Sequence, residues 1–397
     1  MHFDAIGRVP GDPILSLMEA YAQDPNPRKF DLGVGVYKDA QGLTPIPHSV
    51  KLAEARLMEQ QTTKIYIGGH GEPAFGKVIN ELVLGADSPL IRDKRAGASQ
   101  TPGGTGALRL SADFIAQCLP GRGVWLSDPT WPIHESIFAK AGVKVSHYPY
   151  VGRDNRLDIE GMLTALAAAP KGDVVLLHAC CHNPTGFDPS HDDWRRILDV
   201  VRKRELLPLI DFAYQGFGDG LEQDAWSTRL FAAELPEVLI TSSCSKNFGL
   251  YRDRTGALIV CAKTADKLID IRSQLANIAR NLWSTPPDHG AAVVATILGD
   301  PELKNLWVDE VETMRLRIAQ LRSGLVEALE PHGLRERFAH IGVQRGMFSY
   351  TGLSPEQVKQ LRDQHSVYMV GTGRANVAGI DATRLDLLAE AIADVCK

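Results

Sequence analysis

The stretch EVLITSSCSKNFGLYRDRTGALIVCA, residues 237–262, consists of two apolar runs separated by a polar turn. Each run is short and continuous, which is typical of a buried β-strand. The turn contains Lys246 and, eight residues further on, Arg254. A lysine beside a glycine is most often a solvated turn residue. The alternative is that Lys246 is an amine nucleophile with a phosphate-binding arginine nearby.

Strand-like and helix-like segments alternate on the N-terminal side of this stretch. Continuous apolar strands separated by helices of this length are typical of a mostly parallel sheet covered by helices on both faces. The sequence therefore predicts an α/β domain. The predicted strands are residues 123–129, 143–150, 173–181, 207–214, 237–245 and 256–262, and the predicted helices are residues 134–142, 158–170 and 191–206.

The pattern changes after about residue 301, where a long amphipathic segment is followed by short strands and helices. Residues 308–333 are predicted to form one helix that ends at a glycine. Two short apolar runs and two further helical patterns follow, so we expect a smaller α+β unit. These later segments are residues 347–352, 354–366, 367–371 and 382–396.

Composition limits the classes of function. The chain has 397 residues, 44% of them hydrophobic, and a formal net charge of -5 with no block of like charge. This balance argues against binding to nucleic acid or to a membrane surface. The first residues do not resemble a signal peptide, and no apolar run reaches the roughly 20 residues that a membrane helix requires.

The six cysteines include no C-x-x-C pair, a pattern typical of reduced thiols in a cytosolic protein. The run CCH at residues 180–182 is a candidate for metal binding. No second ligand pair follows at zinc spacing, so we expect no metal site.

Polar residues follow each predicted strand of the large domain. In open α/β sheets the ligand site lies beyond the carboxyl ends of the strands, so these side chains are expected to gather at one edge. We therefore predict an active site there rather than a set of unrelated surface residues. The residues are Asp128, Trp131, His178, Asn183, Asp211, Tyr214, Ser243 and Lys246.

The run TPGGTGALRL, residues 101–110, is a candidate phosphate site because Gly103, Gly104 and Thr105 precede a helical pattern. Glycines let the backbone approach an anion, and a helix N-terminus offers free N–H groups. A plain turn that caps a helix explains the run equally well. A third interpretation is a dinucleotide site with Asp128 as the ribose-binding acid. Such a site needs a clear strand before the glycines, and we expect none in the charged, proline-containing residues 92–102.

Asp211 and Lys246 together indicate a particular cofactor. A carboxylate at the end of an apolar strand is costly unless it holds a cation, and a protonated pyridine nitrogen is such a cation. Pyridoxal phosphate needs that partner, because the protonated ring accepts electrons better. Lys246 would form the Schiff base with its aldehyde and then move protons. Ser243 and Arg254 are candidate phosphate ligands, and Asn183, Tyr214 and Trp131 are candidate ring contacts.

With these residues assembled, the sequence resembles the aspartate aminotransferase family of class I aminotransferases, which are fold-type I pyridoxal-phosphate enzymes. Within that family it is most similar to bacterial aromatic-amino-acid aminotransferases. Eight motifs in the family's order carry the resemblance: DLGVGVYKD, TPGGTGALR, DPTWPIH, HACCHNPTG, DFAYQGF, SSCSKNFGLYRDRTG, WSTPPDHGA and GRANVAG.

The resemblance implies an architecture. The large domain is expected to contain a mostly parallel seven-stranded sheet between helices, beside a smaller α+β domain. The expected boundaries are an N-terminal arm at 1–12, a small-domain part at 13–44, the large cofactor-binding domain at 45–313 and the small C-terminal domain at 314–397.

The resemblance also implies a role for each matching residue. Lys246 is the Schiff-base lysine, Asp211 the partner of the ring nitrogen, and Tyr214 and Asn183 the contacts of the phenolic oxygen. Trp131 stacks on the ring, and His134 and His178 orient Asp211. The expected phosphate ligands are Gly104, Thr105, Ser243, Arg254 and, from a neighbouring subunit, Tyr66.

Two arginines are expected to bind substrate, with Trp131 and Asn183 beside them. Arg374 matches the residue that grips the α-carboxylate, helped by the backbone at Gly35. Arg280 matches the partner-subunit residue that pairs with a side-chain carboxylate. The resemblance thus implies a homodimer whose active sites lie at the subunit interface, although a surface ion pair is the ordinary role of an arginine.

The residues that set substrate preference give conflicting indications. Ile65 is apolar where aspartate-preferring relatives commonly have a polar residue, which favours aromatic side chains. Trp283 replaces a common tyrosine, and Cys244 stands where relatives often carry an aromatic residue. Lys38, Thr44 and Thr105 match the aspartate-preferring pattern.

We predict a cytoplasmic aminotransferase that moves an amino group from phenylalanine or tyrosine, with tryptophan and aspartate as further donors, to 2-oxoglutarate. The alternative is an aspartate aminotransferase with minor aromatic activity. A β-lyase, an NAD-dependent oxidoreductase and a non-catalytic binding protein are more distant alternatives.

Overall fold

The computed structural model describes residues 2–8, 11, 13–152 and 155–397. The chain divides into two compact units. The small unit contains Met1–Leu43, Ile318–Val343 and Met347–Lys397, and the large unit contains Thr44–Arg317 and Gln344–Gly346. Residues 1, 9–10 and 12 of the predicted arm lie outside the described residues, and the predicted domain boundaries stay a prediction.

A mostly parallel sheet forms the centre of the large unit, which confirms the predicted α/β class. Within the described residues it has seven strands in the order β2-β8-β7-β6-β5-β3-β4. All neighbours are parallel except that β8 is antiparallel to both β7 and β2. The strands are β2 (Ala96–Pro102), β3 (Val124–Asp128), β4 (Val145–Pro149), β5 (Val174–His178), β6 (Leu207–Phe212), β7 (Val238–Ser243) and β8 (Thr255–Cys261).

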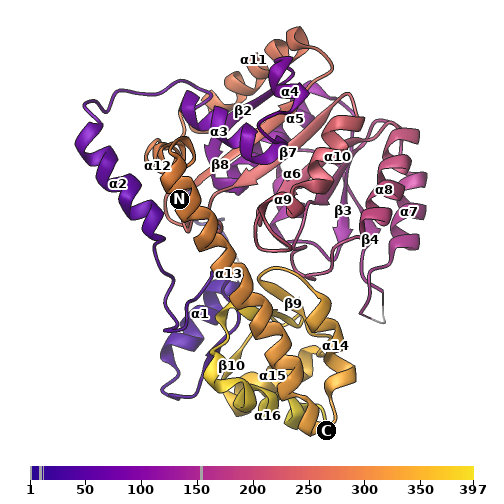
Figure 1. The fold of residues 1–397 in the computed structure, drawn as a ribbon. Helices are drawn as coiled ribbons and strands as arrows, with labels where there is room; N and C mark the ends of the chain where they lie inside the picture. Colours follow the sequence, from indigo (N-terminus) through magenta and orange to yellow (C-terminus); the bar gives the residue numbers. More distant parts are fainter. Residues whose placement is uncertain (1, 9–10, 12, 153–154) are drawn as a thin grey trace. The chain divides into compact units, whose positions relative to one another are not determined.

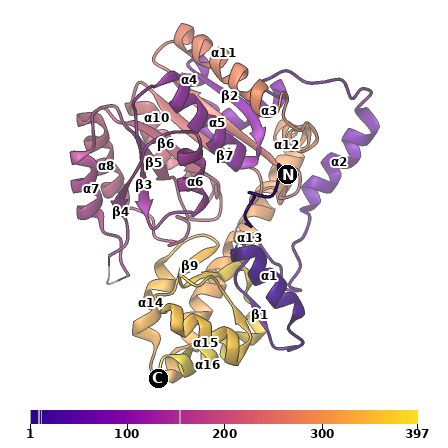
Figure 2. The same ribbon diagram turned by 180° about the vertical axis from the view of Figure 1, so that it is seen from behind.

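Helices cover both faces of this sheet (Figures 1 and 2). One face packs against α5 (Gly103–Cys118), α6 (Ile133–Lys140) and α11 (Ala265–Leu282), and Leu176, Leu209, Leu239 and Leu258 contribute to that core. The other face is covered by α3 (Pro73–Leu84), α7 (Ile159–Ala168), α8 (His191–Lys203) and α10 (Trp226–Glu234). The remaining helices that begin in the large unit are α2 (His48–Gln60), α4 (Pro89–Arg92), α9 (Leu221–Asp224), α12 (His289–Gly299) and α13 (Pro301–Ala328).

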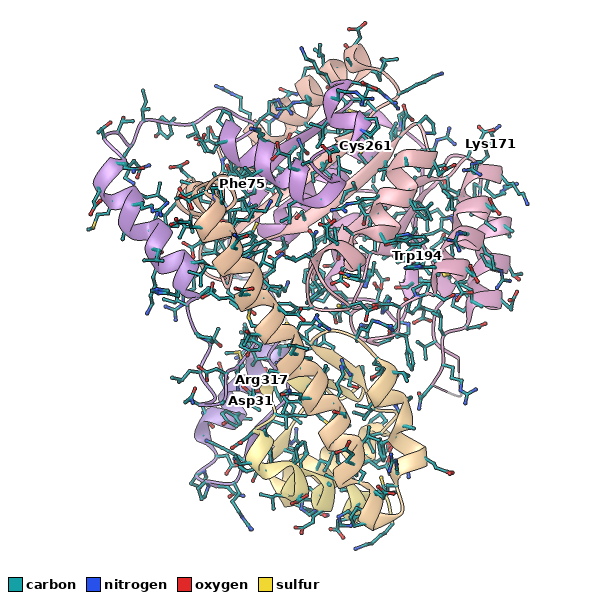
Figure 3. The ribbon with its side chains drawn as sticks, in the orientation of Figure 1. Asp31, Phe75, Lys171, Trp194, Cys261 and Arg317 are labelled. Carbon is teal, nitrogen blue, oxygen red and sulfur yellow. The ribbon has the colours of Figure 1, made fainter. Side chains whose placement is uncertain are left out.

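Helix α8 shows how the sequence produces these layers. Ser190 caps its first turn and forms a reciprocal capping box with Asp193. The buried residues Trp194, Ile197, Leu198 and Val201 have the spacing of one helical face. Trp194 lies edge-on to the ring of Phe231 in α10 with ring centroids 5.7 Å apart, and its place in the unit can be followed in Figure 3.

The expectation that no clear strand precedes the glycines at 103–104 is wrong. Residues 96–102 form β2, which pairs along its whole length with β8. Its side chains are small and polar but mostly buried, so it lacks the apolar pattern of the other strands. Its proline is the last residue of the strand, where the missing N–H costs little. Residues 96–102 form a strand because they pair with β8 and are buried between α3 and α5. Their own composition does not indicate a strand.

The small unit has its own apolar core. Its elements are α1 (Pro13–Gln23), β1 (Phe30–Asp31), α14 (Arg335–Val343), β9 (Phe348–Tyr350), α15 (Pro355–His365), β10 (Val367–Tyr368), β11 (Arg374–Asn376) and α16 (Leu385–Val395). Strand β1 pairs in parallel with β10, and β11 pairs antiparallel with β9. The predicted long helix ends at Ala328, before a 3-10 turn (Glu330–His332) that leads into Gly333 in the left-handed region.

The described residues include no helix that is long and apolar enough to cross a membrane. All six cysteines are free thiols. Four are buried, whereas Cys118 and Cys396 are partly exposed.

Candidate active site

Lys246 lies in the loop that follows β7, at the carboxyl end of the sheet. Its Nζ lies 4.8 Å from the centroid of the Tyr214 ring, which follows the neighbouring strand β6. Burial lowers the pKa of Lys246 to about 8, although the nearby Asp211 opposes that shift and the charge of Arg254 adds to it. About a tenth of this amine is therefore neutral, and hence nucleophilic, at pH 7.

Asp211 lies near the end of β6 and is held at both carboxylate oxygens. Thr241 of β7 donates its hydroxyl to Oδ1 at 3.1 Å, and His134 Nε2 lies 3.3 Å from Oδ2. Burial alone would raise the pKa of Asp211. The hydrogen bond from His134, the neighbouring imidazoles of His134 and His178 and the charge of Lys246 outweigh burial and leave that pKa below its ordinary value. Asp211 is therefore a buried, ionised carboxylate.

Two histidines, His134 and His178, lie beside Asp211. An ionised carboxylate only accepts hydrogen bonds, so His134 carries its proton on Nε2, and its Nδ1 accepts from Thr130 Oγ1 at 2.9 Å. The ring of His178 lies 5.3 Å from that of His134. Burial lowers the pKa of His178 to about 3, so it is a neutral imidazole. The Trp131 ring lies edge-on to His134 at 5.2 Å.

Asn183 and Tyr214 meet on the same edge of the sheet. Asn183 Nδ2 lies 3.5 Å from Tyr214 Oη, at the limit of a hydrogen bond, and Asn183 Oδ1 is buried with no partner. The backbone N–H of Asn183 donates to His178 Nδ1 at 3.1 Å. Tyr214 is thus held beside Lys246, and Asn183 Oδ1 keeps the capacity to accept a hydrogen bond from a ligand.

A second cluster forms where α5 begins. A Cβ added to Gly103 would lie 2.6 Å from the Arg254 guanidinium, and one added to Gly104 would lie 3.1 Å from Ser243 Cβ. The first turn of α5 has no side-chain cap, so its N–H groups are available. Small residues, a helix N-terminus, a hydroxyl and a guanidinium therefore converge in a cradle suited to an anion. Thr105, in the same turn, is exposed.

The family model for aminotransferases of class I and II matches residues 27–392. The chain belongs to that family. It is 75% identical over 395 residues to an aromatic-amino-acid aminotransferase of Pseudomonas aeruginosa, covering 100% of this chain and 99% of the relative. It is 46% identical to an aspartate aminotransferase of Escherichia coli, covering 99% and 100% of the two chains. The predicted family is confirmed.

Solved structures agree with this assignment. An aromatic-amino-acid aminotransferase from Burkholderia pseudomallei, covalently bound to pyridoxal phosphate, superposes with a TM-score of 0.98 at 44% identity. The match covers 100% of both chains. The predicted fold, a fold-type I aminotransferase with a mostly parallel seven-stranded sheet and a smaller α+β part, is therefore also confirmed.

Two predicted substrate residues of this aminotransferase lie in the small unit. Arg374 is 4% exposed, begins β11 and donates from Nη2 to the Gly33 carbonyl at 2.7 Å. Its guanidinium carbon lies 4.4 Å from the centre of the Phe348 ring. A Cβ at Gly35 would lie 2.9 Å from that same ring, so the Gly35 backbone approaches Phe348 closely. The small unit therefore holds this arginine in a fixed orientation.

Two other predicted residues of the aminotransferase are on the surface. Tyr66 is 90% exposed, and its neighbour Ile65 is 77% exposed. Arg280, in the last turn of α11, is exposed as well. A single chain leaves these side chains in solvent, and their predicted roles stay predictions.

Residues that the sequence did not single out complete the site. Thr241 and Thr130 fix Asp211 and His134, and neither was predicted. Thr241 lies directly opposite Asp211 in the parallel pairing of β6 and β7. Aligning the two predicted strands by their ends would have indicated Thr241, whereas nothing in the local sequence indicates Thr130.

The two cysteines of the run CCH belong to a different cluster of this aminotransferase, whereas His182 stacks on His178 with ring centroids 4.1 Å apart. Cys180, Cys181 and Asp224 have potential ligand atoms within 4.8 Å of one another. Three backbone N–H groups in residues 216–219 donate to the oxygens of Asp224. Burial raises the pKa of Cys180 well above its ordinary value, so this thiol is protonated at neutral pH. The turn that Asp224 closes accounts for the cluster, and the expectation of no metal site stays a prediction.

Proposed function

We propose that this protein is a pyridoxal-phosphate-dependent aminotransferase that moves the amino group of an aromatic amino acid to 2-oxoglutarate by a ping-pong route. The products are a 2-oxo acid and glutamate. The observation that carries the proposal is the Lys246 amine, with its pKa lowered to about 8, beside the ionised Asp211. Family membership supports the reaction, and the name of the 75% identical relative supports the aromatic substrate.

The residues present fit pyridoxal phosphate. The cradle of Gly103, Gly104, Ser243 and Arg254 would hold the phosphate, with Thr105 beside it, and a side chain at either glycine would fill it. Asp211 would hold the protonated ring nitrogen, which explains why a buried carboxylate stays ionised. When bound, the cofactor supplies an aldehyde that takes up amino groups and a ring that accepts electrons.

Lys246 has two tasks in this proposal. Its neutral amine would hold the cofactor through the aldehyde, and the same Nζ would move the proton at the substrate Cα when it is free. A pKa of about 8 suits both tasks, because the amine accepts and returns a proton near neutral pH. Tyr214 and Asn183 would orient the cofactor through its phenolic oxygen, and Trp131 would stack on its ring. His134 and His178 keep Asp211 oriented.

Arg374 would bind the α-carboxylate of the amino acid by a two-point contact, with the Gly35 backbone and Asn183 beside it. The contacts of Arg374 with Gly33 and Phe348 support this role, since they reduce the number of orientations available to the guanidinium.

A second copy of the chain would complete each site, so we propose a homodimer. Tyr66 of that copy would bind the phosphate, and Arg280 of that copy would pair with a side-chain carboxylate. Apolar side chains exposed near these residues in sequence support an interface there, namely Met58 (84% exposed), Ile65 (77%), Ile269 (67%) and Leu282 (37%).

We propose a cytoplasmic location, which the six free cysteines support. Substrates would be amino acids and 2-oxo acids, and the expected absence of nucleic-acid and membrane partners stays a prediction.

The second candidate is an aspartate aminotransferase with minor aromatic activity. The 46% identical Escherichia coli relative supports it, as does Lys38, which is paired with Asp31 at 2.8 Å. A comparison of kcat/KM for phenylalanine and aspartate, each with saturating 2-oxoglutarate, separates the two candidates. We expect phenylalanine to be the better donor, and a strong preference for aspartate would establish the alternative.

A further inference from the structure

Two loops bring Lys246 and Tyr214 of the large unit together. Lys246 lies in the loop after β7, and Tyr214 lies in the loop after β6. The two strands pair from Leu209 with Leu239 to Phe212 with Ser242. This pairing ends before Tyr214 on one strand and before Lys246 on the other. Strand pairing alone therefore does not fix the distance between Lys246 and Tyr214.

A side chain that follows the lysine joins these loops. Asn247 is 3% exposed, and its Nδ2 donates to the carbonyl of Gln215 at 3.2 Å. Asn247 comes directly after Lys246, and Gln215 comes directly after Tyr214. One buried hydrogen bond thus connects the residue that follows Lys246 to the residue that follows Tyr214.

The Gln215 end of this connection is anchored. Gln215 is 2% exposed, and its Nε2 donates to the carbonyls of Leu82 and Leu221 at 3.1 Å each. These acceptors come from the end of α3 and the start of α9. The carbonyl that accepts the hydrogen bond from Asn247 therefore belongs to Gln215, whose side chain is itself hydrogen-bonded to two helices.

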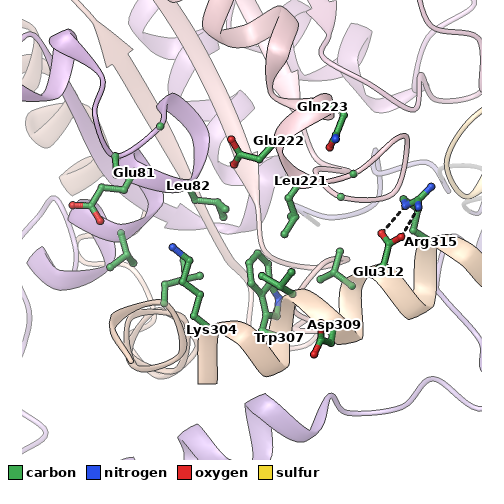
Figure 4. Close-up of a pocket in the computed structure, with 18 of the residues that line it drawn as sticks. Glu81, Leu82, Leu221, Glu222, Gln223, Lys304, Trp307, Asp309, Glu312 and Arg315 are labelled. Carbon is green, nitrogen blue, oxygen red and sulfur yellow. Dashed lines mark hydrogen bonds and ion pairs between the residues drawn. The ribbon is translucent and has the colours of Figure 1, made fainter. Parts of the chain in front are cut away.

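The Asn247 end is anchored as well. Its backbone carbonyl accepts from Trp307 Nε1 at 2.8 Å, and Trp307 stacks on Phe248 with ring centroids 4.5 Å apart. Trp307 is fully buried in α13. It lines a groove of about 700 Å³ together with Leu82 and Leu221, so both anchors meet the wall of one groove (Figure 4).

We propose that Asn247 is a positioning residue that sets the placement of the Lys246 amine relative to Tyr214 and Asp211. The inference rests on the proposed function, in which Lys246 attaches the cofactor and moves a proton. Asn247 acts through the backbone that joins it to Lys246 and through the backbone that joins Gln215 to Tyr214. Without that bond, the lysine loop keeps its hydrogen bond from Trp307 but loses the backbone connection between the residues that follow Lys246 and Tyr214.

The test uses holoenzyme and the variant Asn247→Ala. We expect kcat for the preferred donor to fall about tenfold while KM changes less than about twofold, because the reacting groups are misplaced but the substrate arginines are intact. We also expect the pH midpoint of the cofactor's visible absorbance to rise by about half a unit or more. A less confined lysine nitrogen is better solvated and holds its proton more strongly.

Asn80→Ala is the matched control, because Asn80 in α3 is another asparagine with a buried, unpartnered Oδ1. We expect it to lower Tm without moving the pH midpoint. Trp307→Phe keeps a stacking ring but removes the indole donor, so we expect a smaller shift in the same direction. If Asn247→Ala does not fold, kcat and the pH midpoint of Trp307→Phe test the proposal in its place.

The inference is overturned if Asn247→Ala lowers Tm but leaves kcat and the pH midpoint at wild-type values. It is overturned equally if Asn247→Ala does not fold and Trp307→Phe leaves kcat and the midpoint unchanged. Failure of the proposed function is a different result, in which wild-type protein shows neither visible cofactor absorbance nor transamination.

Discussion

The carboxyl end of the sheet and the surface that carries Tyr66 and Arg280 have opposite characters. At the end of the sheet, Asp211 is hydrogen-bonded to both His134 and Thr241, and burial lowers the pKa of Lys246. On the surface, Tyr66 and Arg280 are exposed. One chain holds the residues around Lys246 in place by itself, whereas the roles proposed for Tyr66 and Arg280 require a second copy. Substitutions in the two regions should therefore have different consequences.

The largest effect is expected from Asp211→Asn. The amide keeps the shape but removes the negative charge that would hold a protonated ring nitrogen, so kcat should fall by about a thousandfold or more. Steady-state kinetics on cofactor-loaded protein measure this. Asp173→Asn is the control, since Asp173 is a buried aspartate that accepts from Gly123 N and Trp125 Nε1. If both variants lost the same small amount of activity, the role given to Asp211 would be wrong.

A selective effect is expected from Arg280→Ala. We predict that kcat/KM for aspartate falls about a hundredfold, because a carboxylate loses its ion-pair partner, while the value for phenylalanine falls less than about fivefold. Tm should change little, since the side chain is exposed in the single chain. Lys267→Ala on the same helix is the control. Equal losses with both substrates would show that Arg280 does not recognise the side-chain carboxylate.

A smaller effect concerns the stability of the cofactor-free protein. The pKa of Lys246 is about 8 in the folded chain and near its ordinary 10.5 in the unfolded chain. Between these values the unfolded chain binds more protons, so stability rises with pH in this window and the cost of the charged lysine is fully present below about pH 8.

Lys246→Met removes that cost. We expect its Tm to exceed that of the wild type by about 1–3 °C at pH 7, and the difference to shrink as pH rises towards 10.5. Lys171→Met is the control, because Lys171 is an exposed lysine paired with Glu205 (Figure 3). A difference that grew with pH would contradict the lowered pKa.

The sequence predicted most of the large unit because its strands are apolar and its helices amphipathic. It did not predict β2, whose small polar side chains are buried only by pairing with β8 and by packing between α3 and α5. The residues that gather at the end of the sheet were predictable because parallel strands place their carboxyl ends together.

Other features depend on contacts between distant segments. Thr130 and the bond from Asn247 to Gln215 have no local pattern that would reveal them. The predicted roles of Tyr66 and Arg280 depend on a second copy, which no sequence pattern within one chain displays.

Reduction of the cofactor-loaded enzyme with borohydride, followed by peptide mapping by mass spectrometry, tests the role of Lys246 most directly. Reduction makes the link between the cofactor and an amine permanent. We predict a single modified peptide with the cofactor on Lys246, together with loss of transaminase activity. An active enzyme that carried the label on another lysine, or that carried none, would contradict the assignment of Lys246 as the reactive amine.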